Sequence, residues 1–134
     1  MLQVSSIAKA LRPLSIAATA LMVFLAVPVL ADGDVAKGEK LFKQCAACHA
    51  IANQASKIGP HLVQIIDRPI GSVEGYKYSP KLVGFSKTTP AWDEATLNAY
   101  LENPRKIIPG GKMAFGGLKK PEDRDNLIAF LKSK

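Results

Sequence analysis

Two cysteines and a histidine lie within five residues of each other, in the stretch "QCAACHA". Cys45 and Cys48 are the only cysteines of the 134-residue chain, and His49 directly follows the second one. Cys-x-x-Cys-His is the attachment pattern of a c-type haem, in which both thiols form thioethers with the porphyrin and the histidine binds the iron. Helical spacing favours this chemistry, because Cys45 and His49, four positions apart, share one side of a helix.

Other uses of two cysteines fit the sequence less well. A disulfide across two intervening residues closes a very short loop and gains little entropy. A thioredoxin-like dithiol needs a βαβ context, which the sequence does not show, and zinc needs a second pair of ligands. The only other histidine of the chain is His61, so a second pair is hard to supply.

The sixth position of a haem iron decides what the protein does, and Met113 is the main candidate for it. It lies in the glycine-rich stretch "PGGKMAFGG" and is the only methionine after residue 31. A methionine sulfur favours the reduced metal and closes the site to oxygen, which indicates electron transfer. His61 is the alternative, as the second ligand of a bis-histidine site, although a partly exposed histidine without iron contact is the commoner case.

The first 31 residues are typical of an export signal. Lys9 and Arg12 precede an uncharged run of 17 residues that ends near Pro28, and small residues follow at a cleavage point after Ala31. The run is shorter than the roughly 20 residues of a spanning helix, so cleavage and a periplasmic location are expected. The alternative is an uncleaved segment that anchors the protein to a membrane.

Residues 32–134 are long enough for one small domain. The formal net charge of the chain is +7, and loss of Lys9 and Arg12 leaves +5. A basic surface favours acidic partners through electrostatic steering. Nucleic acid is excluded as a partner, because the lysines are spread along the chain and the export signal directs it away from nucleic acid. We expect a monomer with no small-molecule substrate.

The pattern of the domain predicts an all-α fold with three main helices. Asp32 and Asp34 are candidate caps of a helix over about residues 34–48, Asp93 caps a second that ends at Pro104, and a third begins at Pro121. Between Gly59 and Pro90, four glycines and four prolines predict mostly loops.

The stretches "GDVAKGEKLFKQCAACH", "IGPHL", "GYKYSP", "LNAYLENPRKIIPGGKMAFGGLKK" and "DRDNLIAFLK" resemble class I c-type cytochromes, in particular cytochrome c2 and mitochondrial cytochrome c. The resemblance runs from about Gly33 to Lys132. It implies the cytochrome c fold, with long loops wrapped around one covalently bound haem. It also implies that the first and last helices cross near Gly38, where a missing side chain permits close approach.

The resemblance implies further roles around the haem. The carbonyl of Pro60 is expected to bond the ring of His49, and Tyr100 to lie near the methionine sulfur. Three residues are similar to those that bond the haem propionates in the family: Arg68, Tyr78 and Trp92. Basic residues at positions similar to the family's docking ring around the haem edge would meet acidic faces of redox complexes: Arg105, Lys106, Lys112, Lys119 and Lys120.

The expected function is that of a soluble, exported carrier of single electrons, and not of an enzyme. By analogy with the family, the protein would carry electrons from a bc1-type complex to a terminal oxidase or a photosynthetic reaction centre. One departure keeps a second function open, because Gly111 stands where the family commonly has a threonine that helps to hold the methionine loop. A looser loop would favour a peroxidase-like enzyme or a gas-binding protein, in which Met113 leaves the iron.

Overall fold

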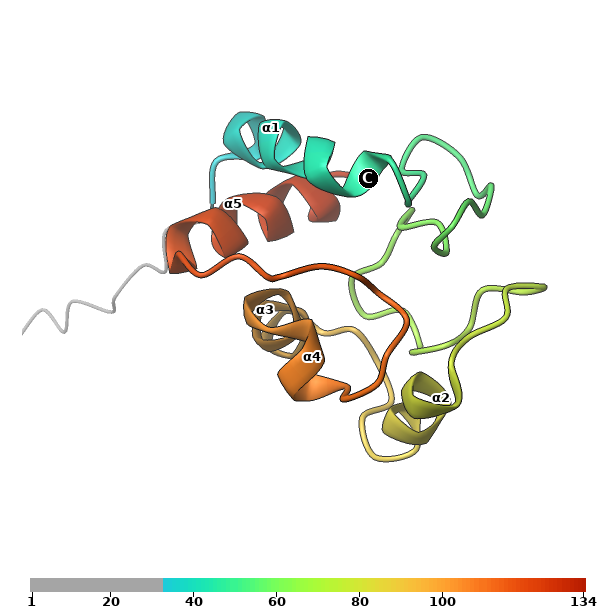
Figure 1. Ribbon diagram of the computed structural model, residues 1–134. Helices are drawn as coiled ribbons and strands as arrows, with labels where there is room; N and C mark the ends of the chain where they lie inside the picture. The colour runs from blue at the N-terminus through green and yellow to red at the C-terminus, as the bar shows by residue number, and fades with distance from the viewer. Residues whose placement is uncertain (1–32) are drawn as a thin grey trace, which may run out of the picture.

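The computed structural model describes residues 33–134, so the predicted export signal lies outside the described residues. The described part is helical and contains no strand, only an isolated bridge between Pro69 and Ala91. None of its helices is long and apolar enough to cross a membrane. Figure 1 shows the elements in chain order: α1 (Val35–Ala46), α2 (Pro80–Ser86), α3 (Glu94–Glu102), α4 (Pro104–Ile107) and α5 (Pro121–Lys132). The predicted all-α fold with three main helices, α1, α3 and α5, is confirmed.

The helix starts follow the capping residues that the sequence offers. The Asp34 carboxylate accepts a hydrogen bond from the backbone N–H of Lys37 at 3.0 Å, and the Asp93 carboxylate accepts one from Thr96 at 2.7 Å. These bonds to backbone N–H groups lower the pKa of both aspartates. Pro121 opens α5, where its missing N–H costs nothing.

The first helix is shorter than predicted, and it ends at Ala46 rather than at residue 48. Cys48 and His49 therefore lie beyond α1, although the His49 N–H still donates to the Cys45 carbonyl at 2.9 Å, as in one more helical turn. The helix stops because the carbonyl groups of Ala46 and Cys48 accept hydrogen bonds from Lys57 and Gly59, which lie 11 positions further along the chain.

Two short helices were not predicted. α2 lies within the stretch expected to be mostly loops, where the Ser79 hydroxyl accepts from the N–H of Leu82 at 3.2 Å and Pro80 occupies the first helical position. α4 follows α3 directly, because Pro104 ends one helix and opens the next behind the cap of Asn103. Both starts carry ordinary capping signals, which the surrounding glycines and prolines obscured.

α1 and α5 pack side by side, with α3 below α5 in Figure 1. They meet at Gly38, where a Cβ atom would overlap the carbonyl oxygen of Asn126. Beside this point the rings of Phe42 and Phe130 lie 5.4 Å apart, centroid to centroid. At the start of α1, the N–H of Asp34 donates to the Asn126 side chain at 2.6 Å. The predicted crossing near Gly38 is therefore present.

The core continues from this crossing toward α3 and the loops. Its most buried side chain is Leu127, which is 1% exposed. Buried Arg124 connects α5 to the preceding segment, because its guanidinium donates to the carbonyl groups of Leu118 and Lys119 and to the side chain of Asn98 on α3. The buried apolar cluster is Phe42, Ile65, Ile70, Trp92, Leu97, Leu101, Ile108, Leu118, Leu127, Ile128, Phe130 and Leu131.

Replacing Gly38 by alanine should destabilise the protein by about 1–3 kcal/mol, the usual cost of overpacking. The new methyl group would press on the Asn126 backbone, so α1 and α5 would have to move apart. Gly84→Ala is the matched control, because Gly84 lies in α2 and nothing stands within 4 Å of its Cβ position. That variant should gain about 0.5–1 kcal/mol. Denaturant unfolding measures both, and equal effects would contradict the close approach.

Candidate haem site

The two cysteines lie at the end of α1 as unbridged thiols. Both are half-buried, and neither forms a disulfide. Burial, together with the neighbouring Cys48, raises the pKa of Cys45. Thioether formation needs reduced sulfur, so two free thiols at this spacing are the donors that covalent attachment of a haem requires.

The segment that carries His49 is fastened to a second segment further along the chain. We call residues 46–50 together with residues 57–62 the histidine clasp. Its backbone bonds run from the Gly59 N–H to the Cys48 carbonyl and from the Leu62 N–H to the Ala50 carbonyl, both at 2.8 Å. The Lys57 ammonium adds a side-chain bond of 2.9 Å to the Ala46 carbonyl. The clasp fixes the backbone on both sides of His49.

The clasp also fixes the imidazole of His49. Its Nδ1 lies 2.7 Å from the carbonyl oxygen of Pro60. A carbonyl oxygen accepts and never donates, so Nδ1 carries the proton and Nε2 keeps a free electron pair. Burial lowers the pKa of His49, and the bond to Pro60 opposes that shift. A Cβ atom on buried Gly59 would overlap the ring. The histidine is thus oriented and neutral, as a metal ligand must be.

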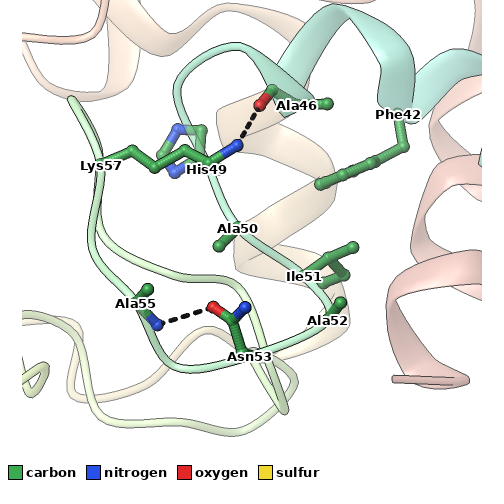
Figure 2. A pocket seen from close by; sticks show the side chains of 9 residues that line it. All are labelled: Phe42, Ala46, His49, Ala50, Ile51, Ala52, Asn53, Ala55 and Lys57. Carbon is green, nitrogen blue, oxygen red and sulfur yellow. Dashed lines mark hydrogen bonds between the residues drawn. The ribbon is translucent and has the colours of Figure 1, made fainter.

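A pocket of about 300 Å³ lies beside the clasp, under the loop that joins its two segments. Figure 2 shows Lys57, at the start of the clasp's second segment, reaching across to the Ala46 carbonyl, with the His49 ring behind it. Asn53 closes a turn in the loop, because its side-chain oxygen accepts from the Ala55 N–H at 3.0 Å. Hydrogen bonds hold this loop, together with Ile51, which packs against the core. The lining residues are Phe42, Ala46, His49, Ala50, Ile51, Ala52, Asn53, Ala55 and Lys57.

Met113 contacts a residue of α3, Tyr100. The Tyr100 hydroxyl donates to the Met113 sulfur at 3.9 Å, a long hydrogen bond even for a sulfur acceptor. Burial raises the pKa of Tyr100 to about 12, so the phenol keeps its proton at neutral pH and stays a donor. The ring of Trp92 lies 4.9 Å from that of Tyr100, and Phe85 packs on Trp92 at 6.2 Å. The structure thus groups Met113, Tyr100 and Trp92 together.

The loop that carries Met113 is tied down at both ends. At its start Gly110 turns the chain with φ of 77°, and the Gly111 N–H donates to Ile108 at 3.0 Å. At its end the Leu118 N–H donates to the Leu101 carbonyl on α3 at 2.7 Å. Between them, the Lys112 ammonium lies 3.4 Å from the Lys77 carbonyl. These bonds hold the loop although Gly111 offers no hydroxyl.

Backbone and side-chain hydrogen bonds position the three residues that are expected to bind the propionates. The N–H of Trp92 donates to the Arg68 carbonyl at 3.0 Å, which brings two of them together. The third, Tyr78, accepts a bond from the Val73 N–H at 3.2 Å. Burial lowers the pKa of Arg68 and raises that of Tyr78. Within residues 33–134, no carboxylate lies within salt-bridge distance of the half-buried Arg68 guanidinium.

His61 is buried, at 9% exposure, and the expectation of a partly exposed side chain is wrong. Its Nδ1 lies 3.3 Å from Arg68 Nη1. The clasp holds the backbone on either side of it, through Pro60 and Leu62, and the guanidinium of Arg68 folds against its ring. The sequence carried no signal for this contact, nor for the bond from Lys57 to Ala46, because neither partner could be inferred from spacing.

These groups fit a haem c. Two thiols, an oriented neutral imidazole and a held thioether are the donors it needs, and the cationic Arg68 without a carboxylate fits its anionic propionates. Half-buried apolar side chains suit the flat porphyrin. Those packed against the core include Leu62, Ile66, Leu82, Phe85 and Phe115.

Comparison with known proteins agrees with this fit. Residues 35–134 match the family model described as Cytochrome c. The chain is 51% identical over 107 residues to a cytochrome c of Gibberella zeae, which covers 77% of this chain and 96% of that protein. It is 46% identical over 102 residues to a cytochrome c2 of Rhodomicrobium vannielii, which covers 75% and 79%.

A solved structure shows the same architecture. Cytochrome cH from Methylobacterium extorquens matches with a TM-score of 0.69 and 39% identity, over 76% of this chain and all of that one. The two cysteines at 45 and 48 have the spacing that covalent attachment requires. The chain therefore belongs to the cytochrome c family, a family of electron carriers, and binds haem c covalently.

Proposed function

We propose that this cytochrome c transfers single electrons with His49 and Met113 as the axial ligands of its haem iron. The bound haem supplies an iron that alternates between two oxidation states. The observation that carries the proposal is the hydrogen bond from Tyr100 to the Met113 sulfur, because it holds a thioether in a half-buried position. The orientation of neutral His49 by Pro60 supports the other ligand.

Each remaining group then has a defined task. Pro60 keeps the His49 Nδ1 proton in place, so Nε2 would be free to bind the iron. Tyr100 fixes the Met113 sulfur, which favours the reduced state. Arg68, Tyr78 and Trp92 would bind the propionates, Arg68 by charge and the other two as N–H or O–H donors. With both axial positions filled, the protein breaks no substrate bond and is not an enzyme.

We further propose that residues 1–31 are removed on export and that residues 32–134 work in the periplasm as a monohaem domain and as a monomer. The pattern of the signal supports this, as does similarity to bacterial proteins such as the cytochrome c2 of Rhodomicrobium vannielii. Relatives from fungi and plants also match, so the similarity alone does not carry the location. Mass spectrometry of the mature N-terminus separates cleavage from an anchored form.

The partners are redox complexes, for example a bc1-type complex and a terminal oxidase or reaction centre. We propose that lysines receive their acidic docking faces. All four are exposed and lie from α4 to the start of α5: Lys106, Lys112, Lys119 and Lys120. Two of them are also tied to backbone carbonyls, Lys112 to Lys77 and Lys119 to Glu102, so their charges are held in place.

Met113→Leu should abolish the absorption band of the sulfur–iron bond and open the iron to carbon monoxide. The parent protein in its reduced form should be inert to carbon monoxide at neutral pH, because the sulfur occupies the sixth position. Tyr100→Phe is the matched variant that keeps the sulfur and removes the hydroxyl bond, so it should retain the band with weaker ligation. Rapid carbon monoxide binding by the parent protein would favour the gas-binding alternative.

Gly59→Ala should lower the yield of haem-attached protein and its stability, by about 1–3 kcal/mol in the free energy of unfolding. The added methyl would press on the His49 ring and turn it away from the Pro60 carbonyl. Gly116→Ala serves as control, since nothing lies within 4 Å of its Cβ position. Haem yield from absorbance and denaturant unfolding measure the difference. Equal behaviour of the two variants would show that the ring has room to move.

Lys106→Gln combined with Lys120→Gln should slow reaction with the anionic oxidant hexacyanoferrate(III) about threefold to tenfold at low salt, since steering by a charged surface acts on the encounter rate. The control removes two exposed lysines of α1, Lys40 and Lys43, and should change the rate less. Stopped-flow kinetics over a range of ionic strength measures the effect. A rate independent of salt in the parent protein would remove these lysines from the docking role.

A further inference from the structure

His61 is a buried histidine that the proposed function does not use. The chain has two histidines, and the other, His49, is the proposed iron ligand. The His61 Nδ1 lies 3.3 Å from Arg68 Nη1. A guanidinium nitrogen only donates, so Nδ1 must accept, and the proton of the neutral ring is on Nε2. The two histidines therefore hold opposite tautomers.

His61 supplies two of the three acceptors that hold the Arg68 guanidinium. Nη2 donates to the His61 carbonyl at 2.9 Å, and Nη1 donates to the Val63 carbonyl at 3.1 Å. The third acceptor is the ring nitrogen. The carbonyl groups keep their electron pairs at every pH, whereas the ring loses its acceptor when it takes up a second proton. The ring is thus the one variable contact among the three.

The electrostatic surroundings of the ring oppose its protonation. Burial lowers the pKa of His61, and the positive charge of Arg68 lowers it further. The other titratable groups that interact with Arg68 are Tyr78 and His49, and Tyr76 packs against Tyr78 at 4.8 Å. Burial raises the pKa of Tyr78, so its phenol adds no negative charge near pH 7, and the charge of Arg68 helps to lower the pKa of His49. No carboxylate within residues 33–134 forms an ion pair with Arg68 that would offset a second positive charge.

We propose that His61 is a positioning residue, whose neutral ring holds the Arg68 guanidinium and releases it on proton uptake, so that the reduction potential depends on pH. The claim about the reduction potential rests on the proposed function, in which Arg68 faces a haem propionate. The sign follows from charge. A protonated ring adds one positive charge beside the haem, which favours the less positive, reduced iron. The potential is therefore higher below the His61 titration and falls as pH rises through it.

The experiment uses the haem-loaded protein and two variants. His61→Asn keeps a side-chain oxygen near the Nδ1 position and does not titrate. His61→Leu removes the acceptor. In the parent protein, NMR should show one histidine titrating below the ordinary value of 6.5, and the Arg68 side-chain N–H signals should shift with the same midpoint. The reduction potential, measured against pH, should fall over the same interval.

The two variants separate the hydrogen bond that the His61 ring accepts from Arg68 and the proton uptake by the same ring. His61→Asn should leave the Arg68 signals in place and abolish the change of potential across that interval. His61→Leu should speed solvent exchange of the Arg68 N–H groups about tenfold at every pH, the effect of losing roughly one hydrogen bond to a charged group.

Two results would overturn the proposal: a His61 titration that leaves the Arg68 signals unmoved, or a potential that still changes with pH in the same way in His61→Asn. Failure of the proposed axial ligation would be seen separately, because the absorption spectrum of the same samples reports the sulfur–iron bond. A missing band with Arg68 signals that still follow His61 would contradict the Met113 ligand and support the positioning role.

Discussion

The hydrogen bond between the His49 ring and the Pro60 carbonyl is the interaction on which the rest of the site depends. It decides which ring nitrogen carries the proton, and thereby which one is free to bind metal. A bond of 2.7 Å to a loop carbonyl would be worth little if that loop could move. The histidine clasp removes this freedom, because its backbone bonds fasten the loop to the segment that carries the cysteines. The attachment cysteines and the proposed ligand His49 thus lie in one rigid unit.

Met113, the proposed second ligand, is held by different means. Met113 lies in a loop without helical structure, and its sulfur is placed by a phenol that projects from α3. α3 is itself fixed to α5 by packing and by Arg124, which bonds Asn98 and the segment before α5. The position of the sulfur therefore depends on the helical scaffold as well as on the bonds that hold the loop. This explains how a glycine at position 111 is compatible with an ordered methionine.

Most of the helix starts could be predicted from the sequence, because they depend on residues a few positions away. Caps at Asp34 and Asp93 act over a few positions. The crossing at Gly38 was expected from the family resemblance instead, because its contact with Asn126 is not local. The end of α1 was not predictable, since it depends on Lys57 and other partners 11 positions away.

The same division holds for the site. The motif Cys-x-x-Cys-His named the attachment chemistry, and resemblance to known proteins suggested Pro60 and Tyr100, whose contacts with His49 and Met113 are the ones observed. The burial of His61 against Arg68 was not foreseen. A side chain that bonds a guanidinium seven positions away leaves no periodic trace, and its polarity suggested the surface instead.

The contact between α1 and α5 joins residues 92 positions apart. α1 and its cysteines precede α5, the helix that packs on α1, so they emerge first both in synthesis and in the proposed export. Until α5 follows, α1 lacks the helix against which it packs. The order of the elements along the chain gives the enzymes that join porphyrin to protein an interval of access, which closes when the final helix docks.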